Sequence, residues 1–156
     1  RVTGVAYPAE GLGHAGSLEG TVGKVTCVQC HMDGADHALG FADSYGTKTF
    51  SSFDVCLSCH TDGDAKDLMK TLQTAVDGKL TTLKDLLVAQ NVMVEVTEES
   101  HGEMVTSYYI VTGTPITANQ QKAYWNFKLV VEDQSKGMHT PTYTKALLDN
   151  SITLVQ

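Results

Sequence analysis

Hydrophobic residues recur every three or four positions between residues 64 and 90, and this spacing predicts a long amphipathic helix with one apolar face. The recurring positions are Leu68, Leu72, Val76, Leu80, Leu83 and Leu87. Asp64 is expected to cap the amino end of this helix, with Asp67 in its first turn. Gly78 is the weak point expected in its interior, because glycine has a low helix propensity.

Two runs of β-branched and aromatic residues follow between residues 91 and 113. They flank the sequence Ser100-His101-Gly102, and such a pair of runs around a short turn is typical of a β-hairpin. We expect His101 at the tip of the hairpin, exposed to water. The hairpin is expected to be a small β insertion in a helical protein.

Helical signals return after the hairpin. Thr117 and Gln120 have the spacing of a capping box, which predicts a helix through AYWNFKLVVEDQS. Gly137 is expected to end that helix, and Thr140 and Pro141 are expected to open a last one. The last helix carries Tyr143, Leu147 and Leu148, and the aromatic residues expected in the core from the preceding helix are Tyr124, Trp125 and Phe127.

The segment before residue 64 has little helical or strand periodicity and is rich in glycine, aspartate, serine and threonine. Such a composition predicts loops. The expected fold is therefore mainly α with a small β-hairpin, in a single domain that spans residues 1–156. Its expected parts are loops in 1–63, the long helix in 64–90, the hairpin in 91–113 and C-terminal helices in 117–156.

The net charge of −7 and the scattered 11 lysine and arginine residues argue against a nucleic-acid partner, because phosphate binding needs clustered cations. A basic or cation-lined partner fits this charge better. No apolar run reaches the roughly 18 to 20 residues of a membrane span. Because the sequence begins at Arg1 without a signal segment, we expect a mature product whose targeting segment was removed or lies outside this sequence.

One short motif occurs twice and accounts for all 4 cysteines. Its copies are CVQCH (Cys27, Cys30, His31) and CLSCH (Cys56, Cys59, His60). A disulfide framework would be sparse in a chain of this length. A zinc site of four thiolates fits the cysteine spacing but leaves both histidines unexplained. The C-x-x-C-H motif attaches c-type haem, so we predict two covalently bound haems c, wrapped by the N-terminal loops.

In this interpretation each cysteine pair forms thioether bonds to one haem, and His31 and His60 are the proximal iron ligands. The remaining histidines, His14, His37, His101 and His139, then compete for the other axial positions. His14 lies in a glycine-rich loop whose backbone can approach a macrocycle closely. His139 is expected to be held at the entrance of the last helix. Methionine ligation stays as an alternative, with Met32, Met69, Met93, Met104 and Met138 available.

Three segments of the sequence resemble the C-terminal haem pair and helical tail of multihaem cytochromes c, the group that includes ammonia-forming nitrite reductases. They are HAGSLEG…CVQCHMDGADH, CLSCHTDGDA and AYWNFKLVVEDQSKGMHTPTYTKALL. The resemblance implies that His139 ligates the haem at His31, and that His14 ligates the haem at His60. It also implies that His37 reaches a haem attached earlier in the chain. No earlier motif exists here, so His37 is expected to be free or to contact another molecule.

We therefore expect an exported electron carrier with two bis-histidine haems, closed to substrates, that serves redox partner proteins. Periplasmic or extracellular residence follows because covalent haem attachment takes place outside the cytoplasm. The chain has no lysine-type attachment motif, unlike the enzymes of the related group, so we expect no catalytic residue and no enzyme. Two alternatives remain open. The chain could be a subunit of an extracellular conducting filament, or a small haem enzyme that reduces nitrite, hydroxylamine or peroxide at an open iron.

Overall fold

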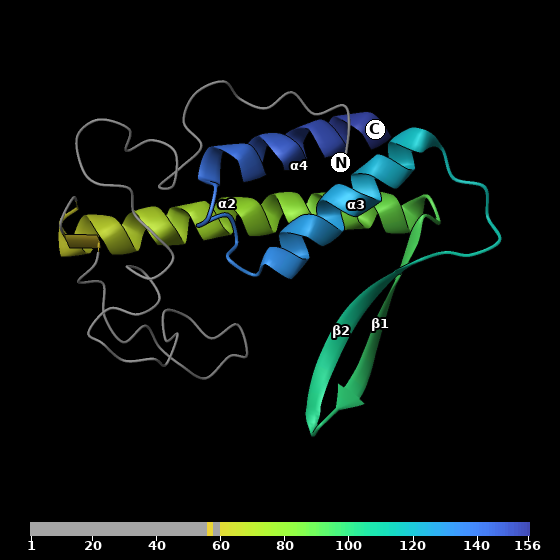
Figure 1. The fold of residues 1–156 in the computed structure, drawn as a ribbon, viewed down its shortest axis with the longest axis horizontal. Coiled ribbons are helices and arrows are strands. Elements are labelled where there is room, and N and C mark those ends of the chain that lie inside the picture. Colours follow the sequence, from red (N-terminus) through yellow and green to blue (C-terminus); the bar gives the residue numbers. More distant parts are fainter. Residues whose placement is uncertain (1–55, 58–59) are drawn as a thin grey trace.

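A computed structural model describes residues 56–57 and 60–156, which form three helices and one antiparallel hairpin (Figure 1). The elements are α2 (Asp62–Ala89), β1 (Met93–Ser100), β2 (Glu103–Ile110), α3 (Ala118–Asp133) and α4 (Pro141–Val155). The expected fold class, mainly α with a small β-hairpin, is confirmed for this part of the chain. The loops expected before residue 56 lie outside the described residues.

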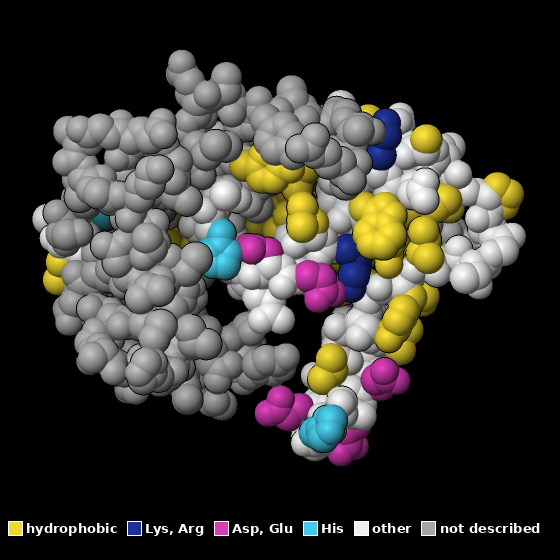
Figure 2. All heavy atoms as spheres, viewed as in Figure 1, with side chains coloured by type: hydrophobic (Ala, Val, Ile, Leu, Met, Phe, Trp, Pro, Cys, Tyr) yellow, Lys and Arg dark blue, Asp and Glu magenta, His cyan; other side chains and the backbone are white. Residues whose placement is uncertain are grey.

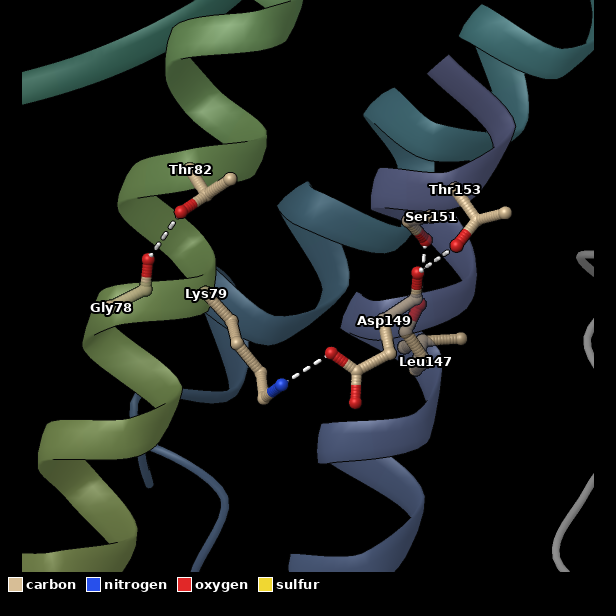
Figure 3. Close-up of polar contacts among 7 residues, drawn as sticks. All are labelled: Gly78, Lys79, Thr82, Leu147, Asp149, Ser151 and Thr153. Atoms are coloured by element: carbon tan, nitrogen blue, oxygen red, sulfur yellow. Dashed lines mark hydrogen bonds and ion pairs between the residues drawn. The ribbon is translucent and has the colours of Figure 1, made fainter. Parts of the chain in front are cut away.

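The long helix α2 begins earlier than expected. Thr61, not Asp64, is its N-cap, and the Thr61 hydroxyl accepts a hydrogen bond from the Asp64 backbone N–H at 3.3 Å. The helix continues through Gly78 without a break, and the Thr82 hydroxyl donates to the Gly78 carbonyl at 3.0 Å (Figure 3). With 28 residues, α2 is about 42 Å long.

Helix α4 packs against both α2 and α3, and the core lies where the three helices meet (Figure 1). The buried apolar side chains of this core are Val76, Leu83, Leu87, Val92, Met93, Ala123, Tyr124, Phe127, Val130, Leu147, Leu148 and Val155. At the edge of the core, Lys79 of α2 forms an ion pair with Asp149 of α4 (Figure 3). The apolar face predicted for α2 is buried in the middle and at the end of the helix, at Val76, Leu83 and Leu87. In the first part of the helix, Leu68 is 54% exposed.

The capping box predicted for α3 is present. The Thr117 backbone N–H donates to Gln120 Oε1 at 2.8 Å, and the Gln120 N–H donates to the Thr117 hydroxyl at 3.1 Å. Tyr124 and Phe127 are buried as expected, but Trp125 is 55% exposed. The expectation for Trp125 is wrong because each helical residue turns by about 100°, which takes position 125 off the face that 124 and 127 share.

Helices α3 and α4 also share a buried polar contact. The Asn126 side-chain amide donates to the Ser151 hydroxyl at 2.8 Å, and Ser151 donates to the Leu147 carbonyl at 2.7 Å. Asn126 is fully buried, and its Oδ1 has no hydrogen-bond partner within the described structure. One buried acceptor of this contact is thus unsatisfied.

The hairpin extends away from the helices as a two-stranded arm (Figure 1). Its base is fixed to the core by Tyr108, whose ring meets that of Phe127 edge-on with centroids 4.9 Å apart, and by a 3.2 Å ion pair between Lys84 and Glu95. His101 is exposed at the tip, as predicted, with a left-handed φ of 54°. None of the described helices is both long and apolar enough to cross a membrane.

Candidate functional site

The second cysteine motif leads directly into α2. Cys56 and Leu57 form a 3₁₀ turn, and the His60 backbone N–H donates to the Cys56 carbonyl at 2.9 Å, immediately before the N-cap Thr61. Residues four apart in a helical turn project from the same side. Cys56 and His60 are both half-buried, and this spacing is compatible with the roles in haem attachment and iron ligation that the motif predicts for them. Cys59 lies outside the described residues.

A second candidate element is the loop between α3 and α4, which rests on the middle of α2. Gln134, with φ of 55°, is the C-cap of α3, so the expectation that Gly137 ends this helix is wrong. Gly137 instead has φ of 88°, and a Cβ there would lie 3.0 Å from Val76 Cγ2. Lys136 pairs with Asp77 at 2.9 Å. The loop is thus anchored to α2 by close packing and by charge.

This loop holds His139 against a carboxylate. His139 Nδ1 lies 2.7 Å from Asp133 Oδ1, and the His139 backbone N–H donates to the Ser135 hydroxyl at 3.3 Å. Ser135 in turn donates its hydroxyl hydrogen to Asp133 Oδ2. Burial raises the pKa of Asp133, but the hydrogen bonds from Ser135 and His139 outweigh burial, so the pKa of Asp133 lies below its ordinary value.

The contact with Asp133 determines which imidazole nitrogen of His139 suits a metal. A carboxylate accepts hydrogen bonds, so in a neutral imidazole Nδ1 would carry the hydrogen and Nε2 the lone pair that a metal needs. Histidines that bind metals usually donate their other N–H to such a carboxylate or to a carbonyl, which fixes the ring and raises its basicity. The side chain of His139 is 55% exposed. The surroundings of His139 therefore fit an axial haem ligand.

The helix that follows begins as expected, except for the side chain of its N-cap. Thr140 occupies the N-cap position and Pro141 the first turn, but the Thr140 hydroxyl makes no capping hydrogen bond. It lies instead 3.4 Å from the Thr144 hydroxyl. His139 thus lies directly before the N-cap of α4, and it hydrogen-bonds to Asp133 and Ser135, which precede it in the chain.

The other predicted ligands do not gather at one place: some lie in the core, some on the surface, and some outside the described residues. Met93 is buried in the core, whereas Met104 is 68% exposed on the hairpin. No three histidine, cysteine, aspartate or glutamate side chains gather into a metal site within residues 56–57 and 60–156. Six predicted site residues lie outside the described residues, namely His14, Cys27, Cys30, His31, His37 and Cys59.

Two residues that support His139 were not predicted from the sequence. Asp133 and Ser135 lie six and four positions before His139, and polar residues at a helix end give no distinctive signal. Their contacts depend on the left-handed backbone of Gln134 and Lys136, which these residue types rarely adopt. The carboxylate beside the histidine is visible only in the folded loop.

Residues 17–156 match a family of c-type cytochromes. That family is cytochrome c552, and the chain belongs to it. Comparisons with curated proteins and with solved structures gave no match. Family membership establishes haem c as the cofactor, and electron transfer or other haem chemistry as the kind of function.

The family also corrects one expectation from the sequence. Cytochrome c552 proteins are associated with nitrite reductase-type enzymes, so the expectation that this chain is not an enzyme is wrong. Members of the family are typically periplasmic, in agreement with the coarse expectation for localisation.

Proposed function

We propose that the chain carries two covalently attached haems c and transfers electrons as part of a nitrite reductase-type enzyme in the periplasm. One haem would be held by Cys56 and Cys59 with His60 on its iron. The other would be held by the corresponding residues of the first motif, Cys27, Cys30 and His31. Haem iron, when bound, would supply a one-electron redox centre.

The observation that carries this proposal is the 2.9 Å hydrogen bond from the His60 backbone N–H to the Cys56 carbonyl, immediately before α2. This hydrogen bond closes a short stretch just before the N-cap of α2, so the thiol-bearing and imidazole-bearing residues of the motif lie near each other along the chain. The same motif occurs at Cys27 in the sequence. We propose that both motifs act in the same way.

The distal ligands proposed here are His139 for the haem at His31 and His14 for the haem at His60. The 2.7 Å contact between His139 and Asp133 supports the first assignment, because it leaves Nε2 as the nitrogen with the lone pair. Ligation by two histidines gives a lower reduction potential than ligation by histidine and methionine. Asp133 would lower the potential further by making the His139 ring more electron-rich.

The proposal is tested by haem stoichiometry and ligation together. Intact-protein mass spectrometry of the exported chain should show the mass of two haems, and Cys59→Ala or Cys30→Ala should each weaken the attachment of one. Electron paramagnetic resonance of the oxidised protein should show two low-spin irons. A single haem, or a bound zinc ion in place of haem, would refute the proposal.

Individual ligands are tested by comparing two exposed histidines. His139→Ala should convert one iron to a high-spin or substituted state, because its axial position opens. His101→Ala at the hairpin tip is the matched control and should leave both signals unchanged. If His139→Ala also leaves both signals unchanged, then His139 is not a ligand, although the dihaem proposal could still hold with another distal residue.

Family membership favours a second candidate, in which one iron is open to substrate. Nitrite reductase-type chemistry needs an accessible iron, and an iron with two protein ligands is closed. Carbon monoxide binding to the reduced native protein distinguishes the two candidates. Binding at one haem would assign the reaction to this chain, whereas absence of binding would leave electron delivery as its contribution.

A further inference from the structure

The two faces of the hairpin have different surroundings. Side chains alternate across a strand, and paired residues share a face. The pairs Met93 with Ile110 and Glu95 with Tyr108 define the inner face, whose base packs on the core and reaches Lys84 of α2, whereas its part near the tip is exposed. The outer face, which we define as Val94, Val96, Val105 and Tyr109 with Glu98 and Glu103, is opposite.

The outer face combines exposed apolar side chains with an acidic end. Val94 is 45% exposed and its cross-strand partner Tyr109 is 50% exposed. Nearer the tip, Val105 is 38% exposed and pairs with Glu98. Figure 2 shows acidic side chains gathered around the histidine at the tip of the arm. An exposed apolar column of this kind, edged by charge, is typical of an interaction site.

The arm is large enough for a transient complex. Each strand has 8 residues, so the arm is about 27 Å long at about 3.4 Å per residue. A two-stranded hairpin with one solvent-facing apolar side gains little stability on its own. Contact with another molecule on the outer face would remove that apolar surface from water.

The charge of the arm selects the kind of partner. Residues 91–113 contain four glutamates, Glu95, Glu98, Glu99 and Glu103, and no lysine or arginine. A second copy of this chain would bring two acidic arms together, and like charges across an interface are unfavourable. An anionic membrane is disfavoured for the same reason. A basic protein with an apolar patch edged by lysine or arginine complements both properties of the outer face.

We propose that the outer face of the hairpin is a docking surface for a basic partner protein. The apolar column would supply the buried centre of the contact, and Glu98 and Glu103 would steer the partner through their charge. This assignment concerns an interface and stands apart from the haem proposal above. It holds whether the chain carries one haem or two.

The test uses the intact haem protein and a lysine-rich single-haem cytochrome c as the probe, with binding measured by calorimetry at low ionic strength. An acidic cytochrome of the same size serves as the control probe. The basic probe should bind and the acidic probe should not. Val94→Thr combined with Tyr109→Thr should weaken binding about tenfold or more, as expected for residues at the centre of an interface.

Matched variants on the inner face separate the docking surface from a general effect. Met104→Thr removes a more exposed apolar side chain from the inner face, and should change affinity less than twofold. Glu98→Gln should reduce the salt dependence of binding more than Glu99→Gln, which removes the same charge from the neighbouring position on the inner face. Circular dichroism and the haem absorption spectrum check that each variant is folded.

Several results would overturn the proposal. If the basic probe does not bind, or if the acidic probe binds equally well, then the charge of the arm does not select a basic partner. Equal losses of affinity in the outer-face and inner-face variants would show that the probe does not bind specifically at the outer face. Light scattering that shows a dimer of the native protein, lost in the Val94 and Tyr109 variant, would show that the outer face binds a second copy of the chain.

Discussion

His139 and Asp133 face each other across the loop that joins α3 to α4, with 2.7 Å between Nδ1 and Oδ1. If His139 ligates iron, Asp133→Asn should raise the reduction potential of one haem, because an amide donates less electron density through the ring than a carboxylate. A tenfold change in the equilibrium corresponds to about 60 mV, and a shift on that order is expected. Spectroelectrochemical titration measures it.

Glu132→Gln is the control for this substitution. It removes the same charge from the neighbouring position, where the carboxylate pairs with Lys128 at 2.6 Å and makes no contact with His139. We expect the potential to change much less than in Asp133→Asn. Equal shifts in the two variants would mean that net charge, not the contact with His139, determines the potential.

The same carboxylate should make stability depend on acid pH. Hydrogen bonds from Ser135 and His139 lower the folded-state pKa of Asp133. The stabilisation is therefore fully present above the unfolded value of about 3.9 and is lost as pH falls through the lower folded-state pKa. Asp133→Asn should melt below the native protein at neutral pH, and the difference should shrink in acid. A difference that is constant with pH would contradict this assignment.

Two glycines that lie in different backbone conformations should respond oppositely to substitution by alanine. Gly137 has φ of 88°, and a Cβ there would lie 3.0 Å from Val76, so Gly137→Ala should destabilise the protein by about 1–3 kcal/mol. Gly78 lies inside α2, and a Cβ there would meet nothing within 4 Å. Gly78→Ala should therefore stabilise by about 0.5–1 kcal/mol. Denaturant unfolding followed by circular dichroism measures both.

The buried contact between α3 and α4 gives a test by double substitution. Ser151→Ala removes the acceptor of the Asn126 amide, whose other polar atom already has no partner in the described structure. We expect a loss of about 1–3 kcal/mol, because a buried donor is left unsatisfied. Asn126→Leu combined with Ser151→Ala should cost less than the sum of the two single changes. Additive losses would show that the hydrogen bond contributes no coupling.

The fold was predictable where the signal was local. The capping box of Thr117 and Gln120 depends on residues three apart, and the turn at His101 depends on three consecutive residues, so both were predicted. The start of α2 was predicted at Asp64 because threonine and aspartate are both good N-caps. Only the structure shows that the Thr61 hydroxyl receives the Asp64 N–H, which adds residues to the amino end of the helix.

The sequence predicts the covalent chemistry of the site but not the contacts that support it. The C-x-x-C-H motif predicts the roles of Cys56 and His60 by type and spacing alone, and these roles stay predictions. The contact of Asp133 with His139 depends on left-handed residues that sequence rules assign to glycine, and on packing of Gly137 against a helix distant in the sequence. Contacts of this kind arise from tertiary structure and leave no periodic trace in the sequence.

Helix α2 begins beside the Cys56–His60 turn and ends at the base of the hairpin, about 42 Å away for its 28 residues. A helix anchored by a buried stripe and by the pair of Lys79 with Asp149 acts as a stiff rod between the two ends. If His60 ligates an iron, substitutions in the arm would therefore lie far from that ligand. Such a separation would let changes in partner binding evolve with little effect on the surroundings of the motif at the amino end of α2.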